Sequence, residues 1–283
     1  MGAFANQFKT IVLLGLLTGL LLWFGSFFGQ QGLTVAIIFV VLMNFVTYFF
    51  SDKIVLAMYG AKPLDKKHWL YALVGDVAKK AGLPMPKVYI IPTPSPNAFA
   101  TGRSPNHAAV ACTEGILHIL DKNELRGVLA HEMSHVKNRD ILVATIAATI
   151  AGVISYLAQM AQWGLMFGGG RGQEGRGQGN IFGFILLIIV TPIVAMLIQL
   201  AISRSREYLA DATGARTIKD PKSLASALRK IHAGIAANPM RHGNRATASL
   251  FIDNPFRGEA LVSLFSTHPP MEERVKRLNE MKI

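Results

Sequence analysis

The residues best suited to chemistry are two histidines four positions apart, His131 and His135, with Glu132 directly after the first. Residues four apart on a helix share one face, so both imidazoles could hold one zinc ion. Glu132 lies about 100° further round, where it can face a water on that zinc without binding the metal. Zinc lowers the pKa of such a water toward neutrality, and Glu132 can take its proton while the hydroxide attacks a peptide carbonyl. The pattern predicts a zinc hydrolase centre.

The surrounding sequence predicts that this motif lies on a helix. Apolar residues recur at helical spacing before and after the histidines, Asp121 is a candidate N-cap, and Glu124 three residues later completes the pattern of a capping box. The alternative is a polar patch on a surface helix that carries two unrelated histidines. A third ligand would favour the metal site, because a catalytic zinc usually has three protein ligands.

The third ligand must come from elsewhere in the chain. Where the longer motif H-E-x-x-H-x-x-G-x-x-H has its glycine and its third histidine, this sequence has Asn138 and Ile141. Glu207 is the candidate, because it follows one hydrophobic segment about as closely as His135 precedes another. If those segments are antiparallel and their helices run on, both side chains stand about 8–9 Å outside the same membrane face.

Asp211 follows Glu207 by four residues and therefore shares its helix face. It could accept a hydrogen bond from a ligand imidazole, the usual arrangement around bound zinc. Glu207 could instead pair with Arg204 or Arg206, but its matching height beside His135 favours the metal. The sequence therefore predicts one zinc ion per subunit, held by the two histidines and Glu207.

The composition is that of a membrane protein. The 283-residue chain is 51% hydrophobic and 16% charged, with a mean hydropathy of +0.35, whereas ordinary domains have about 25% charged residues. A net charge of +12 could indicate nucleic acid, but basic cytoplasmic segments explain it, and interleaved aromatic and basic residues are lacking. We expect no nucleic-acid partner. The single Cys112 excludes an internal disulfide and is expected to be a small buried side chain.

Four apolar segments are long enough to cross a lipid bilayer: residues 11–28, 33–50, 141–167 and 181–202. Only residues 29–32 separate the first two, so they should form a tight hairpin. The second pair contains glutamines and lacks an aromatic belt, which leaves open that it is partly buried in protein. The chain thus divides into a transmembrane hairpin, a first catalytic part, a second hydrophobic hairpin and a second catalytic part, with boundaries 1–51, 52–140, 141–202 and 203–283.

Basic residues set the expected orientation. Of the 29 lysines and arginines, 12 lie in residues 52–140 and 14 in residues 203–283, whereas the loops within the two hairpins have few. By the positive-inside rule, both catalytic parts and both chain ends are cytoplasmic. The two parts would then assemble one cytoplasmic domain.

An edge strand is expected close to the zinc helix. An amphipathic helix is predicted over residues 66–81 and strands over residues 87–91 and 107–111. Between the strands, Asn97, Ala98 and Phe99 read by themselves as a loop leading into a short edge strand. Beside a hydrolase centre such a strand gains a use, because an extended peptide can pair with it through main-chain hydrogen bonds.

These motifs resemble a known family. His131-Glu132-x-x-His135 followed, after a hydrophobic pair, by Glu207-x-x-x-Asp211 resembles the HtpX branch of the membrane zinc metalloproteases related to CAAX prenyl endopeptidases. Asn97-Ala98-Phe99-Ala100 resembles that family's substrate-side strand, and Ser266-Thr267-His268-Pro269-Pro270 with Arg274 resembles its C-terminal signature. The resemblance covers nearly the whole chain. It implies zinc-dependent cleavage of misfolded or damaged membrane and cytoplasmic proteins, in quality control and the stress response at the bacterial inner membrane.

The expected fold is mainly α with a small β-sheet: four hydrophobic membrane helices and, by the resemblance, a gluzincin-like zinc metallopeptidase domain. Glu132 is the expected general base, and the expected partners are protein substrates and the lipid bilayer. His268 could donate to the oxyanion or support the site, although a histidine before two prolines more often caps or packs against a helix. Two other functions stay open: a processing protease for one lipidated or membrane substrate, and a non-enzymatic zinc-binding membrane scaffold or stress sensor.

Overall fold

The computed structural model describes residues 2–26, 29–151, 204–240, 243–256 and 269–283. Most of the predicted second hydrophobic hairpin, residues 141–202, lies outside these residues, and so does His268.

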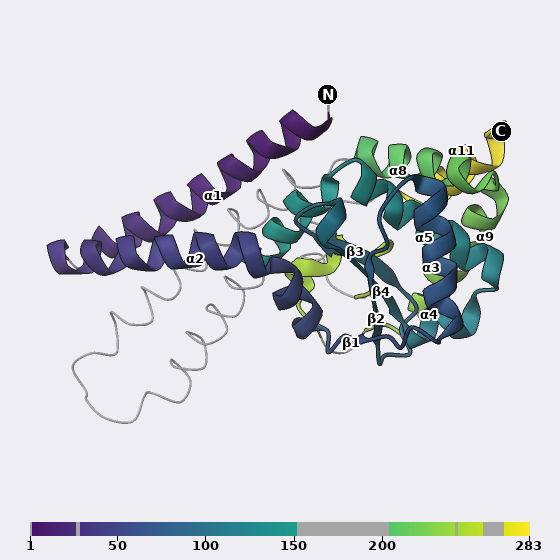
Figure 1. Ribbon diagram of the computed structural model, residues 1–283, viewed down its shortest axis with the longest axis horizontal. Coiled ribbons are helices and arrows are strands. Elements are labelled where there is room, and N and C mark those ends of the chain that lie inside the picture. The colour runs from purple at the N-terminus through teal and green to yellow at the C-terminus, as the bar shows by residue number, and fades with distance from the viewer. Residues whose placement is uncertain (1, 27–28, 152–203, 241–242, 257–268) are drawn as a thin grey trace.

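Two long apolar helices, α1 (Gly2–Ser26) and α2 (Gly29–Met58), lie side by side and project from the rest of the molecule (Figure 1). The Asn44 side chain donates a hydrogen bond to Thr18 Oγ1 at 2.8 Å and so links the two helices. Residues 29–32, expected to connect two spans, instead form the first turn of α2. Gly29 has a φ of 68°, a left-handed conformation that glycine adopts without strain, so the helix can begin at that residue.

Within the described residues, α2 is the one helix that is both long and apolar enough to cross a membrane. α1 contributes a shorter apolar stretch, Phe8–Trp23, and a further apolar helix spans Asp140–Ala151. The large apolar side chains of α2 lie mostly on the surface, with Ile38 and Val41 each 66% exposed. An exposed apolar surface of this extent marks contact with lipid or protein. Of the four membrane helices expected from the sequence, one is therefore found as a clear span in the described part of the chain.

The sheet has four strands in the order β1-β2-β4-β3. Their bounds are β1 Lys62–Pro63, β2 Lys87–Ile91, β3 Ala98–Gly102 and β4 Ala108–Thr113. β2 and β4 are parallel, and the two outer pairs are antiparallel. The predicted strand 87–91 is found with its predicted ends, and the second strand is displaced to 108–113 because a short 3-10 turn, η1 (Pro105–His107), takes up His107. β3 lies at one edge, as expected for the candidate substrate strand.

Alternate residues of the sheet pack into two different hydrophobic clusters. Ala98, Val110 and Cys112 face a large core shared with the helices that follow, and Cys112 is buried as predicted. Phe99 and Ala111 face the opposite way, toward the end of α2 and residues 248–256. This alternation is the period of two expected for a strand that is buried on both faces. The sheet thus separates the helical core from the base of the membrane hairpin.

Tyr59, which directly follows α2, connects that hairpin to the rest of the molecule. Its ring packs edge-on against Phe251 at a centroid distance of 4.9 Å and lies 6.0 Å from the ring of Phe99. Its hydroxyl group is hydrogen-bonded to the Thr247 side chain. α2, β3 and the 247–251 segment therefore share one aromatic cluster, which fixes their relative positions.

Helices pack on the other face of the sheet, to the right of it in Figure 1. Apolar side chains of α3 and α5 lie in one cluster with side chains from β2, β3 and β4. The helix bounds are α3 Trp69–Ala81, α4 Glu114–Ile119, α5 Lys122–Lys137, α8 Arg204–Ile218, α9 Pro221–Ala237 and α11 Met271–Glu280, with a 3-10 turn, η2, at Arg245–Leu250.

α5 begins at the predicted capping box. The Asp121 carboxylate accepts hydrogen bonds from the backbone of Asn123 and Glu124, and the Glu124 carboxylate accepts one from the backbone of Asp121. Glu124 also accepts hydrogen bonds from Ser226 and Lys230 of α9, at 2.7 and 2.8 Å. The box satisfies amides that a helix start leaves unpaired, and the two further bonds anchor this end of α5 to α9.

Two glycines let α5 approach its neighbours closely. A Cβ atom at Gly214 of α8 would lie 2.8 Å from the backbone nitrogen of His131, and one at Gly127 of α5 would lie 2.9 Å from Leu224 Cα of α9. Any larger residue at either position would push the helices apart. The close contact at Gly214 holds the start of α8 over the histidine face of α5.

α5 ends at Lys137, before the apolar helix Asp140–Ala151 begins. Arg139 between them has a φ of 60°, in the left-handed region that non-glycine residues seldom adopt. The expectation that the zinc helix runs on into the membrane segment is therefore wrong, because the chain bends at Arg139. This bend brings Asp140 close to His135.

Candidate metal centre

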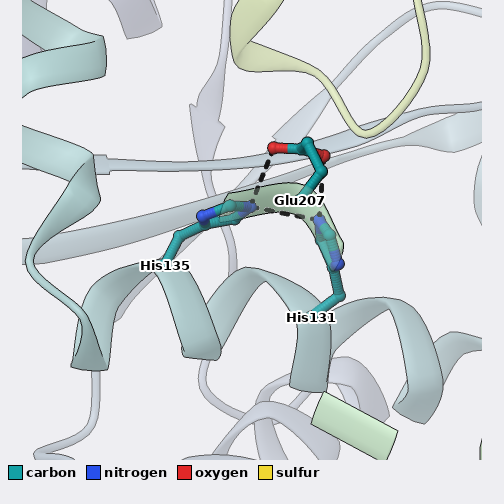
Figure 2. A group of neighbouring side chains, drawn as sticks. All are labelled: His131, His135 and Glu207. Carbon is teal, nitrogen blue, oxygen red and sulfur yellow. Dashed lines mark hydrogen bonds and ion pairs between the residues drawn. The ribbon is translucent and has the colours of Figure 1, made fainter. Parts of the chain in front are cut away.

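Three side chains meet between α5 and α8. His131 and His135 point from α5 toward Glu207 of α8, as Figure 2 shows, and their potential ligand atoms all lie within 4.8 Å of one another. The two Nε2 atoms are 3.2 Å apart, and the Glu207 oxygens lie 3.7 Å from His131 Nε2 and 3.4 Å from His135 Nε2. The distances of His135 and Glu207 from the flanking hydrophobic segments predicted that these three residues meet, and the structure brings them together.

These separations fit one zinc ion. Zinc binds imidazole nitrogen and carboxylate oxygen at about 2.0–2.2 Å in tetrahedral geometry, which places neighbouring ligand atoms about 3.3–3.5 Å apart. The 3.2 Å between the two Nε2 atoms and the 3.4 Å from His135 Nε2 to Glu207 Oε1 lie close to that value, and the other carboxylate oxygen, Oε2, lies 3.7 Å from His131 Nε2. The buried His131, the partly buried His135 and the buried carboxylate of Glu207, at these distances, match the ligand set of a catalytic zinc with a fourth position for water.

On the side of its ring away from the cluster, His131 contacts Asp211, which forms a tight ion pair with Arg274. Its Nδ1 lies 2.9 Å from Asp211 Oδ1, and Arg274 of α11 donates two hydrogen bonds of 2.8 Å to the same carboxylate. Burial disfavours the ionised form of Asp211, but the Arg274 charge and the hydrogen bonds from Arg274 and His131 outweigh it and lower its pKa to about 2. Ionised Asp211 keeps the proton on Nδ1 and leaves the Nε2 lone pair directed at the cluster.

A carboxylate also lies beside Nδ1 of His135, and the sequence analysis did not predict it. This Nδ1 lies 3.4 Å from Asp140 Oδ2, and Arg206 Nη1 lies 3.4 Å from Asp140 Oδ1. In a helix, residue 140 would not share the face of residue 135, so periodicity could not find this contact. Arg206, considered above as a partner for Glu207, lies within ion-pair distance of Asp140.

Glu132 is buried beside the cluster, 2% exposed, and Ala100 of β3 donates a backbone hydrogen bond to its Oε2 at 2.8 Å. Burial raises the pKa of Glu132 to about 8. A desolvated carboxyl group of this kind holds a proton more tightly than an exposed glutamate does.

A small cavity adjoins these groups. It is lined by side chains of the cluster, by Ala100 of β3 and by residues 249–252, and its volume is about 40 Å³. A water needs roughly 10–15 Å³, so the cavity has room for a few waters beside the cluster.

The three residues predicted to bind substrate, Asn97, Ala98 and Phe99, make contacts within the protein and do not face the cavity. The backbone carbonyl of Ala98 accepts a hydrogen bond from Ile252 at 3.1 Å, and the Asn97 side chain donates to the backbone of Asp253 at 2.7 Å. The Phe99 ring packs against Phe251. None of the three lines the cavity, whereas Ala100, one position further along, does.

A helical domain with a small mixed sheet, in which two histidines and a glutamate surround one point beside a buried carboxyl group, defines a metallopeptidase-type protein. The comparisons agree: the model of Peptidase family M48 matches residues 64–282, and the chain belongs to this family. Membership makes the chain a metalloprotease, and helix α2 fits association with a membrane.

Relatives of this chain are each named "Protease HtpX homolog". The protein of Syntrophobacter fumaroxidans is 53% identical over 98% of this chain and 99% of its own length. The Aquifex aeolicus protein is 53% identical over 93% and 89%, and the Thermococcus kodakarensis protein 52% identical over 96% and 95%. The crystal structure of S. mikatae Ste24p matches with a TM-score of 0.52 at 20% identity and covers 97% of this chain and 65% of that one, which shows a shared fold.

Proposed function

We propose that this protein is a membrane-embedded zinc endopeptidase that cleaves misfolded or damaged membrane and cytoplasmic proteins. The observation that carries the proposal is the triangle of His131, His135 and Glu207, whose edges suit one zinc ion, beside a buried Glu132. The family supplies the reaction class, since a peptidase acts on proteins. The relatives are named proteases, which favours an enzyme over a zinc-binding scaffold.

The bound metal would supply a Lewis acid and a water whose pKa falls toward neutrality. His131, His135 and Glu207 would hold it, and Asp211 would fix the orientation of His131. Glu132 accepts the proton of the attacking water and returns it to the leaving amine of the cleaved bond. Ala100 N–H, which is hydrogen-bonded to Glu132 Oε2, fixes the direction of that carboxylate. Because the cluster is buried, little bulk water competes for these hydrogen bonds.

The proposed topology places four helices in the bilayer: α1, α2 and two from residues 141–202. The exposed apolar surface of α2 and the shorter apolar stretches in α1 and Asp140–Ala151 support it. The distribution of lysine and arginine favours a cytoplasmic catalytic domain, built from residues 52–140 and 203–283, at the bacterial inner membrane. Two measurements in intact cells and in inverted vesicles test this orientation: chemical labelling of cysteine variants and cleavage by an added protease, each of which reports the segments that face the outer solution.

Glu132→Gln in the detergent-purified full-length protein tests the mechanism. We expect it to bind zinc as the wild type does and to lose cleavage of casein by at least ~10²-fold, the usual contribution of a general base. Glu280→Gln, an exposed carboxylate on α11, is the matched control and should retain activity. Unchanged cleavage by Glu132→Gln would refute the proposed role of Glu132, and activity that survives full removal of metal by a chelator would refute the zinc mechanism.

Glu207→Ala tests the third ligand directly. We expect zinc content to fall well below one per subunit at micromolar free zinc, because two ligands remain. Full zinc occupancy in this variant would remove Glu207 from the site. To distinguish general quality control from a processing protease, cleavage of casein and of an unfolded membrane protein is compared with cleavage of their folded forms. A broad preference for unfolded chains supports the proposal, and cleavage at one position of one substrate supports the alternative.

A further inference from the structure

We propose that Asp140, held by Arg206, is a positioning residue for the metal ligand His135. This inference rests on the proposed function, since it assumes that His135 binds zinc. The two carboxylate oxygens of Asp140 face different partners: Oδ2 lies 3.4 Å from His135 Nδ1, and Oδ1 lies 3.4 Å from Arg206 Nη1. Asp140 is 7% exposed, so this contact is largely shielded from water.

The path of the chain explains how Asp140 reaches His135. Five residues along an unbroken α-helix correspond to a rotation of about 140°, which would turn residue 140 away from residue 135. α5 ends at Lys137, Arg139 adopts a φ of 60°, and the next helix begins at Asp140. This bend returns the carboxylate to the histidine that lies in the last turn of α5.

The two metal-binding histidines then have equivalent surroundings. Behind His131, Nδ1 meets Asp211, which is held by Arg274; behind His135, Nδ1 meets Asp140, which lies against Arg206. Both arrangements follow the order imidazole, carboxylate, guanidinium. The first is tight, with separations of 2.9 and 2.8 Å, and the second is looser, at 3.4 and 3.4 Å.

The chemistry of a ligand imidazole explains the value of this contact. A histidine that binds zinc through Nε2 must carry its proton on Nδ1, and a carboxylate that accepts this proton fixes both the tautomer and the ring orientation. Asp140 supplies such an acceptor for His135. Arg206 lies beside Asp140, and Lys9 of α1 is close enough to interact electrostatically with both residues.

Arg206 adds a second consequence, because it directly precedes the ligand Glu207 in α8. The Arg206–Asp140 pair therefore links the chain just after α5 to α8 beside the third ligand. The histidines and the glutamate come from these two helices, so the pair stabilises their relative position at the membrane-side end of α5.

The test measures zinc binding by chelator competition in full-length, detergent-purified variants. Asp140→Asn removes the charge and Asp140→Ala removes the acceptor; we expect zinc affinity to fall ~10-fold or more, and further for alanine, within the ~10–100-fold range typical of such carboxylates. Asp140→Glu should recover part of the loss, and Arg206→Gln should weaken binding in the same direction by a smaller factor. Asp76→Asn, a partly exposed aspartate of α3 that pairs with Lys80 and Arg126, is the matched control and should bind zinc normally.

A spectroscopic readout separates positioning from a general loss of folding. In the cobalt-substituted protein, the visible absorption bands report the ligand geometry, and we expect them to shift in Asp140→Asn while the thermal unfolding of the metal-free protein stays close to that of the wild type. Zinc affinity within twofold of the wild type together with an unchanged cobalt spectrum would overturn the inference. Loss of cleavage alone, with normal zinc and cobalt binding, would assign Asp140 to substrate and would also overturn it.

The proposed function can fail independently. If Glu132→Gln cleaves casein normally, the general-base mechanism is wrong whatever Asp140 does. If Glu132→Gln is inactive and His135→Ala loses zinc while the Asp140 variants bind it normally, the mechanism stands and only the positioning role is refuted.

Discussion

Gly214→Ala is expected to weaken the metal site without changing any residue that forms it. A Cβ atom at this position would lie 2.8 Å from His131 N and 2.9 Å from the carbonyl carbon of Ala130, both backbone atoms of α5. Ordinary contacts of this kind begin near 3.4 Å, so α8 must move away from α5 by about 0.6 Å. Overpacking of this size usually costs about 1–3 kcal/mol, and the higher helix propensity of alanine returns up to ~1 kcal/mol.

The same displacement acts on the ligand triangle. Glu207 lies two helical turns before Gly214, on the same face of α8, so it moves with that helix. Its separations from the histidine nitrogens, now 3.4 and 3.7 Å, would open toward 4 Å or more, beyond the ~3.3–3.5 Å that a tetrahedral zinc allows. We expect zinc affinity to fall at least ~10-fold, equivalent to about 1.4 kcal/mol.

Two other glycines provide matched controls. A Cβ at Gly127 would lie 2.9 Å from Leu224 Cα, so Gly127→Ala should displace α9 and lower stability by a similar amount while zinc affinity stays within about threefold of the wild type. At Gly75 of α3 the nearest atom would be Met85 Sδ at 3.6 Å, so Gly75→Ala should be neutral or slightly stabilising. Thermal unfolding of metal-free protein and chelator competition are measured for all three. Wild-type zinc affinity in Gly214→Ala, or an equal loss in Gly127→Ala, would refute the argument.

Three further predictions follow from buried or ionised groups. Arg274→Met leaves the buried Asp211 carboxylate without its cationic partner and should destabilise the protein by about 3–5 kcal/mol in thermal or denaturant unfolding, whereas adding Asp211→Asn should recover part of that loss; simple additivity would contradict a coupled pair. Burial opposes ionisation of Glu124, but hydrogen bonds led by that from Lys230 lower its pKa below the usual value. Its charge therefore stabilises the fold above pH ~4.5 and ceases to do so as the pH falls through the lowered pKa, so Glu124→Gln, which preserves the capping box, should be less stable than the wild type at pH 6 and converge with it at lower pH. Burial also raises the pKa of the Cys112 thiol to about 12, so an aromatic disulfide reagent should label it only when the protein unfolds, with rapid labelling of native protein as the contrary result.

Local signals in the sequence were sufficient where the structure depends on neighbouring residues. The capping box at Asp121 and Glu124 and the apolar spacing of α5 are both found, because a helix start is determined by hydrogen bonds within one turn. The strand at residues 87–91 is found because its β-branched and aromatic residues favour a strand by their local preference. The division into two hydrophobic hairpins and two catalytic parts stays a prediction, since residues 152–203 lie outside the described residues.

The cluster of His131, His135 and Glu207 is a different case, because the reasoning that located it was partly wrong. It assumed that α5 continues into the following helix, but Arg139 bends the chain there. Glu207 nevertheless reaches the histidines, since its position depends on the packing of α8 against α5 at Gly214. Asp140 was missed because its contact with His135 depends on that bend, and no periodicity encodes a single left-handed residue.

The long-range contacts of β3 also could not be predicted from the sequence. Its edge position follows from the strand order, but the hydrogen bonds that occupy this edge come from Glu132 of α5 and from Ile252, far away in the chain. A pattern of alternating residues predicts which faces of a strand are buried and contains no information about distant amides.

The hydrogen bond from Ile252 to Ala98 has a consequence for substrate selection. An extended peptide that pairs with β3 at this carbonyl must displace Ile252, whose own carbonyl is held by Arg274 at 2.8 Å. The peptide exchanges one amide for another, so the backbone gain at this position is close to zero. Net affinity must then come from additional residues bound on either side. If a peptide pairs with β3 in this way, a longer extended segment is therefore expected to bind more tightly than a short one.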